Sequence, residues 1–256
     1  MGAKGHKVRH AFLTHADRDH IAGLLQFNQL NSRDGIPEYY YPKDCGSFPA
    51  LQDFMGKFDP QSGPGTWIGL SEGDSIDIGK GLVVEARKSL HVTKEDQTKA
   101  LDYTLCRVTK SLKPEFRGLE GPKIAALRTE YGENHIQETH TERWIGYSGD
   151  SPSLDPNHWE NTKILFHEAT FLDPETAKNA HSNLPQVLSA ASQMDLEALV
   201  LLHFSSRYKQ LEIQQAVRKL ANQHQPKFPI YAVYPSEPDM DILSGQPAWE
   251  PGSTSS

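Results

Sequence analysis

The stretch Thr14-His15-Ala16-Asp17-Arg18-Asp19-His20 decides the fold of this chain and its chemistry. It begins at the last residue of a run, Val8 to Thr14, that predicts a strand. Two imidazoles and two carboxylates thus fall within six residues in a loop at a strand end. Such a loop can turn several side chains toward one point, and this donor mixture suits Zn²⁺, Mn²⁺ or Fe. The alternative is a polar loop that caps the next helix, but the density of ligands favours a metal site.

Twelve of the 256 residues are histidine. Six of them lie in short polar motifs at or just beyond apolar runs, where metal sites are commonly built: His15, His20, His91, His167, His181 and His203. The net charge of −7 leaves room only for a local basic face. That balance excludes a general nucleic-acid coat, but not an enzyme that grips one phosphate through metal.

Length and composition predict one domain, residues 1–234, followed by a flexible tail, residues 235–256, which is rich in Pro, Ser, Gly and acidic residues. The two cysteines, Cys45 and Cys106, lack a CxxC spacing, which indicates a reducing, cytoplasmic location. No apolar run approaches the ~18–20 residues that cross a bilayer, so we expect no membrane partner.

Hydrophobic periodicity predicts short strands first and then strands that alternate with helices. We expect further strands at 39–41, 76–78, 82–90, 101–108, 144–147, 163–166, 199–202 and 229–233, and helices at 21–30, 48–58, 122–131, 184–194 and 211–221. This order is typical of a layered α/β domain whose active loops lie at strand ends.

Four further motifs follow predicted strands or precede a helix. They are Ser148-Gly149-Asp150, His167-Glu168-Ala169-Thr170-Phe171, His181-Ser182-Asn183 and His203-Phe204-Ser205-Ser206-Arg207-Tyr208. Taken singly, each has an ordinary structural explanation: a turn, a helix cap or a satisfied core histidine.

Their succession resembles that of ribonuclease Z in the metallo-β-lactamase superfamily, over roughly residues 8–208. The resemblance implies an α/β fold, the metallo-β-lactamase αββα sandwich, in which two mixed β-sheets are flanked by helices. The metal loop begins about ten residues into this chain, whereas the family has some fifty residues upstream. We therefore expect the sandwich to be N-terminally incomplete.

The resemblance also implies a ligand set for two divalent metal ions, zinc foremost. The implied ligands are His15, Asp17, Asp19, His20, His91, Asp150 and His203, with Asp150 as the bridge. The match at His91 is looser because residues 92–100 look inserted, so His135 and His140 are alternatives. Where the family has a second histidine this chain has Asp17, an oxygen ligand that would favour Mn or Fe relative to zinc.

For catalysis, the resemblance implies that metal-activated hydroxide attacks phosphorus. Asp19 would orient the nucleophile, and His181, held by Glu168, would protonate the leaving group. Ser205 and Arg207 would bind substrate.

The function implied is that of a phosphodiester hydrolase, an RNA endonuclease of the tRNA 3′-end processing type, acting on precursor tRNA as a homodimer. Two alternatives stay open: a small-substrate hydrolase such as a cyclic-nucleotide phosphodiesterase or an esterase, and a non-catalytic relative with an impaired metal site. Residues 109–143, where the family carries a basic arm that grips tRNA, hold as many glutamates as lysines and arginines. We therefore predict a reduced arm.

Overall fold

The computed structural model describes residues 8–32, 37–91, 93–94, 96–175, 180–236, 242 and 245–252. A small sheet has three parallel strands in spatial order: β1 (His10–Phe12), β2 (Glu38–Pro42) and β3 (Thr66–Leu70). Three helices connect its strands: α1 (Arg18–Ile21), α2 (Leu24–Asn31) and α3 (Ser47–Phe58).

A large sheet has seven strands in the order β12-β11-β10-β9-β8-β5-β4. These strands are β4 (Ser75–Gly79), β5 (Leu82–Lys88), β8 (Leu101–Leu112), β9 (Gln137–Tyr147), β10 (Thr162–Glu168), β11 (Ala198–Leu202) and β12 (Ile230–Ala232). Strands β9 to β12 are parallel, and β8 runs against both β9 and β5. Consequently β5, β9, β10 and β11 all run in one direction. A two-stranded ribbon of β6 (Thr93–Lys94) and β7 (Gln97–Thr98) lies between β5 and β8 in sequence.

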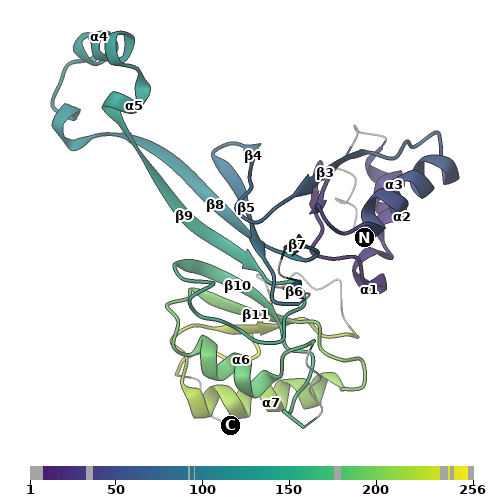
Figure 1. Cartoon of the computed structure of the whole chain (residues 1–256). Helices are drawn as coiled ribbons and strands as arrows, with labels where there is room; N and C mark the ends of the chain where they lie inside the picture. Colours follow the sequence, from purple (N-terminus) through teal and green to yellow (C-terminus); the bar gives the residue numbers. More distant parts are fainter. Residues whose placement is uncertain are drawn as a thin grey trace.

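Three apolar clusters show how the layers stack. One lies between α2 and α3 and the small sheet, and it includes Tyr39. A second joins the two sheets and includes Tyr40. Because successive strand residues point to opposite faces, these two tyrosines of β2 serve different layers. The third cluster packs helices α6 (Leu184–Ala191) and α7 (Gln210–His224) onto the large sheet (Figure 1). The order helix, sheet, sheet, helix confirms the predicted αββα sandwich.

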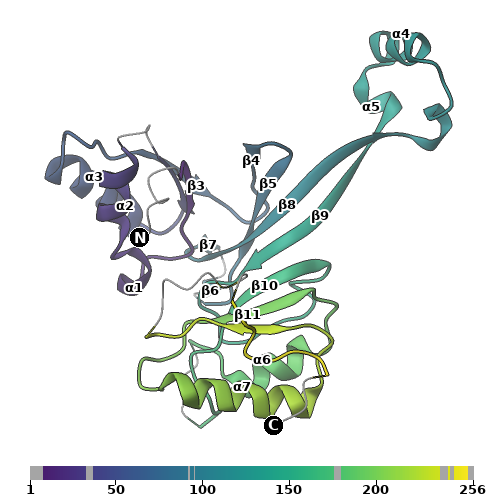
Figure 2. The same cartoon turned by 180° about the vertical axis from the view of Figure 1, so that it is seen from behind.

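Strands β8 and β9 extend well beyond the large sheet as a ribbon. Pairing with β5 ends at Arg107, and pairing with β10 begins at Arg143, whereas β8 and β9 remain paired to Leu112 and Gln137. At the tip lie a short 3₁₀ helix (Pro114–Phe116), α4 (Gly121–Tyr131) and α5 (Glu133–Ile136). We call residues 108–142 the arm, which projects from the sandwich (Figures 1 and 2).

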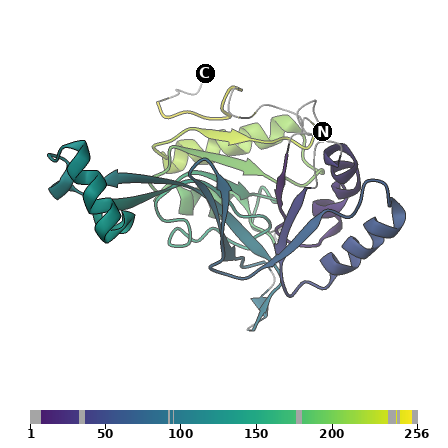
Figure 3. The ribbon, with the colours of Figure 1, turned by 90° about the horizontal axis from the view of Figure 1, so that it is seen from above.

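The strands that build the arm are therefore longer than the sequence predicts. The expected strands, 101–108 and 144–147, stop where the sequence becomes polar. Strands that are exposed on both faces lack the alternation that reveals a strand in sequence. Figure 3 shows the arm from above, standing clear of both sheets.

The C-terminal segment 245–252 lies against the large sheet, unlike the flexible tail expected from residue 235. Trp249 is buried, its backbone bridges Ile230, and its indole nitrogen donates to Asn222 Oδ1 at 2.7 Å. Burial of the indole offsets the entropic cost of ordering this polar segment. Composition alone does not reveal such a contact. The rest of the predicted tail, 237–241, 243–244 and 253–256, lies outside the described residues. No helix in the described part of the chain has the length and apolarity needed to span a bilayer.

Candidate metal centre

The seven predicted metal ligands come together at one edge of the sandwich. His15 follows β1, His91 follows β5, Asp150 follows β9 and His203 follows β11 directly. The three strands of the large sheet run in the same direction, so their carboxyl ends meet at this edge. Helix α1 contributes Asp19 and His20, and Asp17 immediately precedes it. A turn of helix, rather than the loop expected over 15–20, therefore orients two of the ligands.

A first group of ligands consists of His15, Asp17 and His91, whose ligand atoms lie within 4.8 Å of one another. Asp17 Oδ2 is 3.8 Å from His15 Nε2 and 3.7 Å from His91 Nε2. The carboxylate of Asp17 is mostly exposed, whereas both imidazoles are nearly buried. The looser match at His91 is thus supported by geometry, while His135 and His140 lie on the arm, away from this edge.

A second group consists of Asp19, His20 and His203, again within 4.8 Å. Asp19 Oδ2 is 3.6 Å from His20 Nε2 and 3.3 Å from His203 Nε2. Each group therefore offers two imidazole nitrogens and one carboxylate. The two sets have the same composition because Asp17 takes the place of a histidine.

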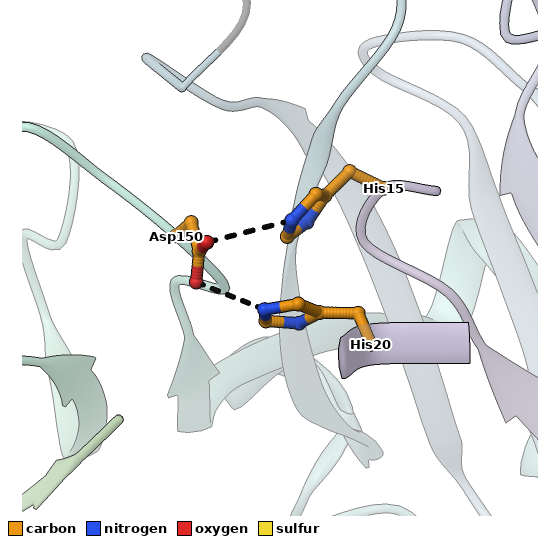
Figure 4. Close-up of side chains that lie close together, drawn as sticks. All are labelled: His15, His20 and Asp150. Atoms are coloured by element: carbon orange, nitrogen blue, oxygen red, sulfur yellow. Dashed lines mark ion pairs between the residues drawn. The ribbon is translucent and has the colours of Figure 1, made fainter. Parts of the chain in front are cut away.

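Asp150 lies between the two groups, with one oxygen toward each (Figure 4). Its Oδ2 is 3.5 Å from His15 Nε2, and its Oδ1 is 3.2 Å from His20 Nε2 and 3.5 Å from His203 Nε2. Burial opposes ionisation of this carboxyl, but the surrounding imidazoles hold the pKa of Asp150 well below its ordinary value. Asp150 is therefore an ionised carboxylate with one oxygen facing each group.

Three of the four ligand histidines have their Nδ1 atom opposite an oxygen. Nδ1 of His15 is 3.0 Å from Thr14 Oγ1, and that of His91 is 3.3 Å from the carbonyl oxygen of Ala180. Nδ1 of His203 is 2.9 Å from Thr170 Oγ1. An oxygen that accepts a hydrogen bond from Nδ1 fixes the tautomer in which the Nε2 lone pair is free. Histidines that bind metal are usually held in this tautomer by such a hydrogen bond.

The turn that carries Asp150 depends on Gly149. Its φ of +55° lies in the left-handed region, and a Cβ there would sit 2.9 Å from Thr14 Cβ and Cγ2. Only glycine allows this turn to approach the residue before His15 without strain. His203 also has a positive φ, +62°, which is uncommon for a residue with a side chain and is found most often at functional sites.

Glu168 lies at the end of β10, fully buried, and is held by four neighbours. It accepts from the backbone nitrogens of Ser151 and Ser182 at 2.7 and 3.2 Å and from Thr170 Oγ1 at 2.5 Å. Its Oε1 is 3.1 Å from Nδ1 of His181. This hydrogen bond raises the pKa of His181, although burial opposes the shift, and so favours the imidazolium form.

Sequence reasoning quoted Thr170 in a motif but gave it no role. Its hydroxyl contacts both Glu168 and His203, so it couples the acid–base pair to a ligand. Its position two residues after Glu168 in the motif is the sequence signal that could have suggested this contact. The predicted substrate residues lie close by: Ser205 N donates to the carbonyl oxygen of Thr170, and Arg207 Nε donates to Ser205 Oγ at 3.0 Å. The Arg207 guanidinium also lies over the Phe171 ring.

No family model matches the chain. It is 28% identical over 225 residues to the chloroplastic tRNase Z TRZ2 of Arabidopsis thaliana, an alignment that covers 82% of this chain and 61% of that protein. It is also 28% identical over 233 residues to ribonuclease Z of Natronomonas pharaonis, covering 80% and 72%. The crystal structure of the metallo-β-lactamase fold protein YhfI from Bacillus subtilis superposes with a TM-score of 0.55 at 15% identity, covering 85% and 74%.

The chain is similar in sequence to ribonuclease Z proteins and has the metallo-β-lactamase fold. It spans about three fifths of the length of the Arabidopsis relative. The sequence identity supports the likeness to ribonuclease Z, and the structural match supports the fold. The motifs that carry the resemblance are the ones that meet at the candidate metal centre.

Proposed function

We propose that this protein is a metal-dependent phosphodiester hydrolase that cleaves RNA at the centre built around Asp150. The observation that carries the proposal is the convergence of four histidine Nε2 atoms and three aspartates on two adjacent points. Oriented imidazoles and shared carboxylate are what a two-cation site requires.

The donor atoms themselves fit divalent cations. His15 Nε2 and Asp150 Oδ1 are buried, and among the described residues neither makes a hydrogen bond of good geometry. Such groups cost free energy unless a ligand satisfies them. Two divalent cations held here would supply Lewis acidity, lowering the pKa of a water and neutralising phosphate oxygens.

The residues of the chain would divide the remaining work. Asp19, exposed beside His20 and His203, would accept a proton from the attacking water and orient it toward phosphorus. Nδ1 of His181, which is 3.7 Å from Asp150 Oδ2, is engaged by Glu168, and this leaves Nε2 to donate a proton to the leaving oxygen. Arg207 would pair with a phosphate of the substrate.

The two ligand groups have the same composition, and this affects which metal ions we expect them to bind. Each has two imidazoles, one carboxylate of its own and a share of Asp150. Zinc fits both, and the extra oxygen ligand, Asp17, improves the fit of Mn²⁺ or Fe²⁺ in the first. We expect two ions of one kind per chain.

RNA is the substrate favoured by the arm and by the names of the relatives. A ribbon that projects from the sandwich can contact a macromolecule far from the scissile bond, which a small substrate cannot use. The arm has five lysines and arginines against six glutamates, however. That balance keeps a small phosphodiester, such as a cyclic nucleotide, as the second candidate. Dimerisation and a cytoplasmic location stay predictions.

The test measures metal per chain and hydrolysis of bis(p-nitrophenyl) phosphate, precursor tRNA and cyclic AMP with added Zn²⁺ or Mn²⁺. We expect two ions, turnover of the model diester and cleavage of precursor tRNA. Asp150→Ala should abolish turnover, whereas Glu160→Ala, an exposed carboxylate farther along the same loop, should not. Metal-free, inert protein would refute the proposal, and turnover of cyclic AMP without tRNA cleavage would favour the second candidate.

A further inference from the structure

Three residues that sequence reasoning did not select lie directly behind the metal centre. Ser89 follows β5, Asp102 is the second residue of β8, and His158 lies in the loop after Asp150. Ser89 and Asp102 are buried, with 2% and 3% of their surface exposed. None of the three belongs to the ligand groups or to the Glu168–His181 pair.

Ser89 joins two ligand-bearing segments. Its hydroxyl donates to the backbone carbonyl oxygen of Asp150 at 3.2 Å and accepts from the backbone nitrogen of His91 at 3.2 Å. One side chain therefore fixes the backbone at the bridging ligand and at a ligand of the first group. These segments are about sixty residues apart in sequence, and β8 lies between their strands in the sheet.

Asp102 supports this junction from behind. Its carboxylate lies close enough to Ser89 for the two groups to interact electrostatically, and it forms an ion pair with His158, whose Nε2 is 3.2 Å from Asp102 Oδ2. The ion pair ties down the loop that leaves Asp150. Neighbours on β8 hold the loop that carries His15: Leu101 N donates to the carbonyl oxygen of Thr14, and Tyr103 Oη donates to that of Leu13.

Burial of the Asp102 carboxylate behind the candidate metal centre costs free energy. Burial raises the pKa of Asp102 to about 6, against the opposing effects of His158 and Ser89. An apolar residue of similar volume would often make the fold no less stable. The carboxylate therefore needs a reason other than stability, and its contacts supply one.

We infer that Ser89, Asp102 and His158 form a positioning network that sets the separation of Asp150 and His91, and hence the affinity of the centre for its metal ions. The inference rests on the proposed function. It assigns these residues no contact with substrate, only control over the placement of two ligands.

Metal affinity and metal-free stability separate this role from a merely structural one. The variants are Asp102→Leu, Ser89→Ala and the conservative Asp102→Asn, which keeps a polar side chain of the same size beside Ser89 and His158. The control is Thr104→Val, a buried β8 residue whose hydroxyl has no hydrogen-bond partner among the described residues. Zn²⁺ and Mn²⁺ dissociation constants come from chelator competition, and melting temperatures are measured on metal-free protein.

We expect about 10- to 100-fold weaker metal binding for Asp102→Leu and about tenfold for Ser89→Ala, as for other groups that orient ligands. Asp102→Asn should recover most of the affinity, and Thr104→Val should retain it. Metal-free melting temperatures should stay within about 5 °C of wild type. Should Asp102→Leu fail to fold, Ser89→Ala decides the question.

A twofold change in metal affinity corresponds to only about 0.4 kcal/mol. If wild type binds metal and both Asp102→Leu and Ser89→Ala bind it within about twofold of wild type, the positioning role is refuted, while the proposed function is not. A wild-type protein that takes up no metal overturns the proposed function together with this inference.

Discussion

The two ends of the β8–β9 pair belong to one ribbon, but they differ in burial and in the number of neighbouring strands. At the metal edge, β8 begins with four consecutive buried residues, Leu101 to Thr104. Beyond Arg107 the same strand has no buried residue, and α4 at the tip has none either. A strand that is held on both sides places atoms within tenths of an ångström, whereas a ribbon with one partner can bend.

The contrast teaches how one pair of strands can serve two tasks. Chemistry needs ligands held in fixed geometry, which neighbours on both sides of β8 and β9 provide. Recognition of a large, irregular molecule tolerates and benefits from a longer, more adaptable element. Changes at the metal edge should therefore affect every substrate, and changes on the arm only a large one.

The largest expected effect is that of His181→Asn at the metal edge. Without a proton donor, cleavage of precursor tRNA, whose leaving group is an alkoxide, should slow by about 10²–10⁴-fold. Hydrolysis of bis(p-nitrophenyl) phosphate should change little, because p-nitrophenolate leaves without protonation. Rate constants for the two substrates, measured at equal metal occupancy, check this. Equal losses on both would remove His181 from the role of acid.

Shortening the arm should produce the opposite pattern. Replacing residues 113–136 with a two-residue Asn-Gly turn keeps the β8–β9 hairpin in register. We expect kcat/KM for precursor tRNA to fall by about 10- to 100-fold, since a loss of about 1.4–2.8 kcal/mol of remote binding energy is typical of a lost contact surface. Turnover of the model diester should be unchanged. If tRNA cleavage survives intact, the arm does not recognise RNA.

A matched pair of glycine substitutions compares the two ends directly. Gly149→Ala introduces a Cβ that clashes with Thr14 at a positive φ, whereas Cβ at Gly118 on the arm meets nothing within 4 Å. Gly149→Ala should destabilise the protein by about 1–3 kcal/mol and weaken metal binding. Gly118→Ala should change the free energy of unfolding by less than about 1 kcal/mol. Urea denaturation and metal titration measure both, and equal effects would contradict the contrast.

The smallest expected effect concerns the pH dependence of stability. A carboxyl group whose pKa is about 6 when folded, and about 3.9 when unfolded, binds its proton more tightly in the folded state. Its contribution to stability is therefore full below about pH 4 and is lost as pH rises through about 6, in total about 2–3 kcal/mol. Asp102→Asn removes this loss.

Between pH 5 and 7.5, the free energy of unfolding of metal-free Asp102→Asn should therefore rise relative to wild type by about 1.4 kcal/mol. Denaturation of both proteins across that range measures the difference. Parallel pH profiles would show that Asp102 is ionised throughout.

The sequence by itself predicted the fold class and the residues that meet at the candidate metal centre. A strand followed by dense histidine and aspartate, then Ser148-Gly149-Asp150 and His203 after apolar runs, carries the information locally, because strand ends and turn residues depend on short-range chemistry. Helix α3 and strands β5 and β11 follow from the same periodicity.

Only the tertiary structure decided how the pieces meet. Strand β3 and the extensions of β8 and β9 into the arm were missed because their residues do not alternate between buried and exposed in the expected way. The burial of Trp249 against Ile230, the contacts of Thr170 and the Ser89–Asp102–His158 network join residues far apart in the chain. Such contacts arise from packing of distant segments, and no local pattern encodes the distance between two side chains that only folding brings together.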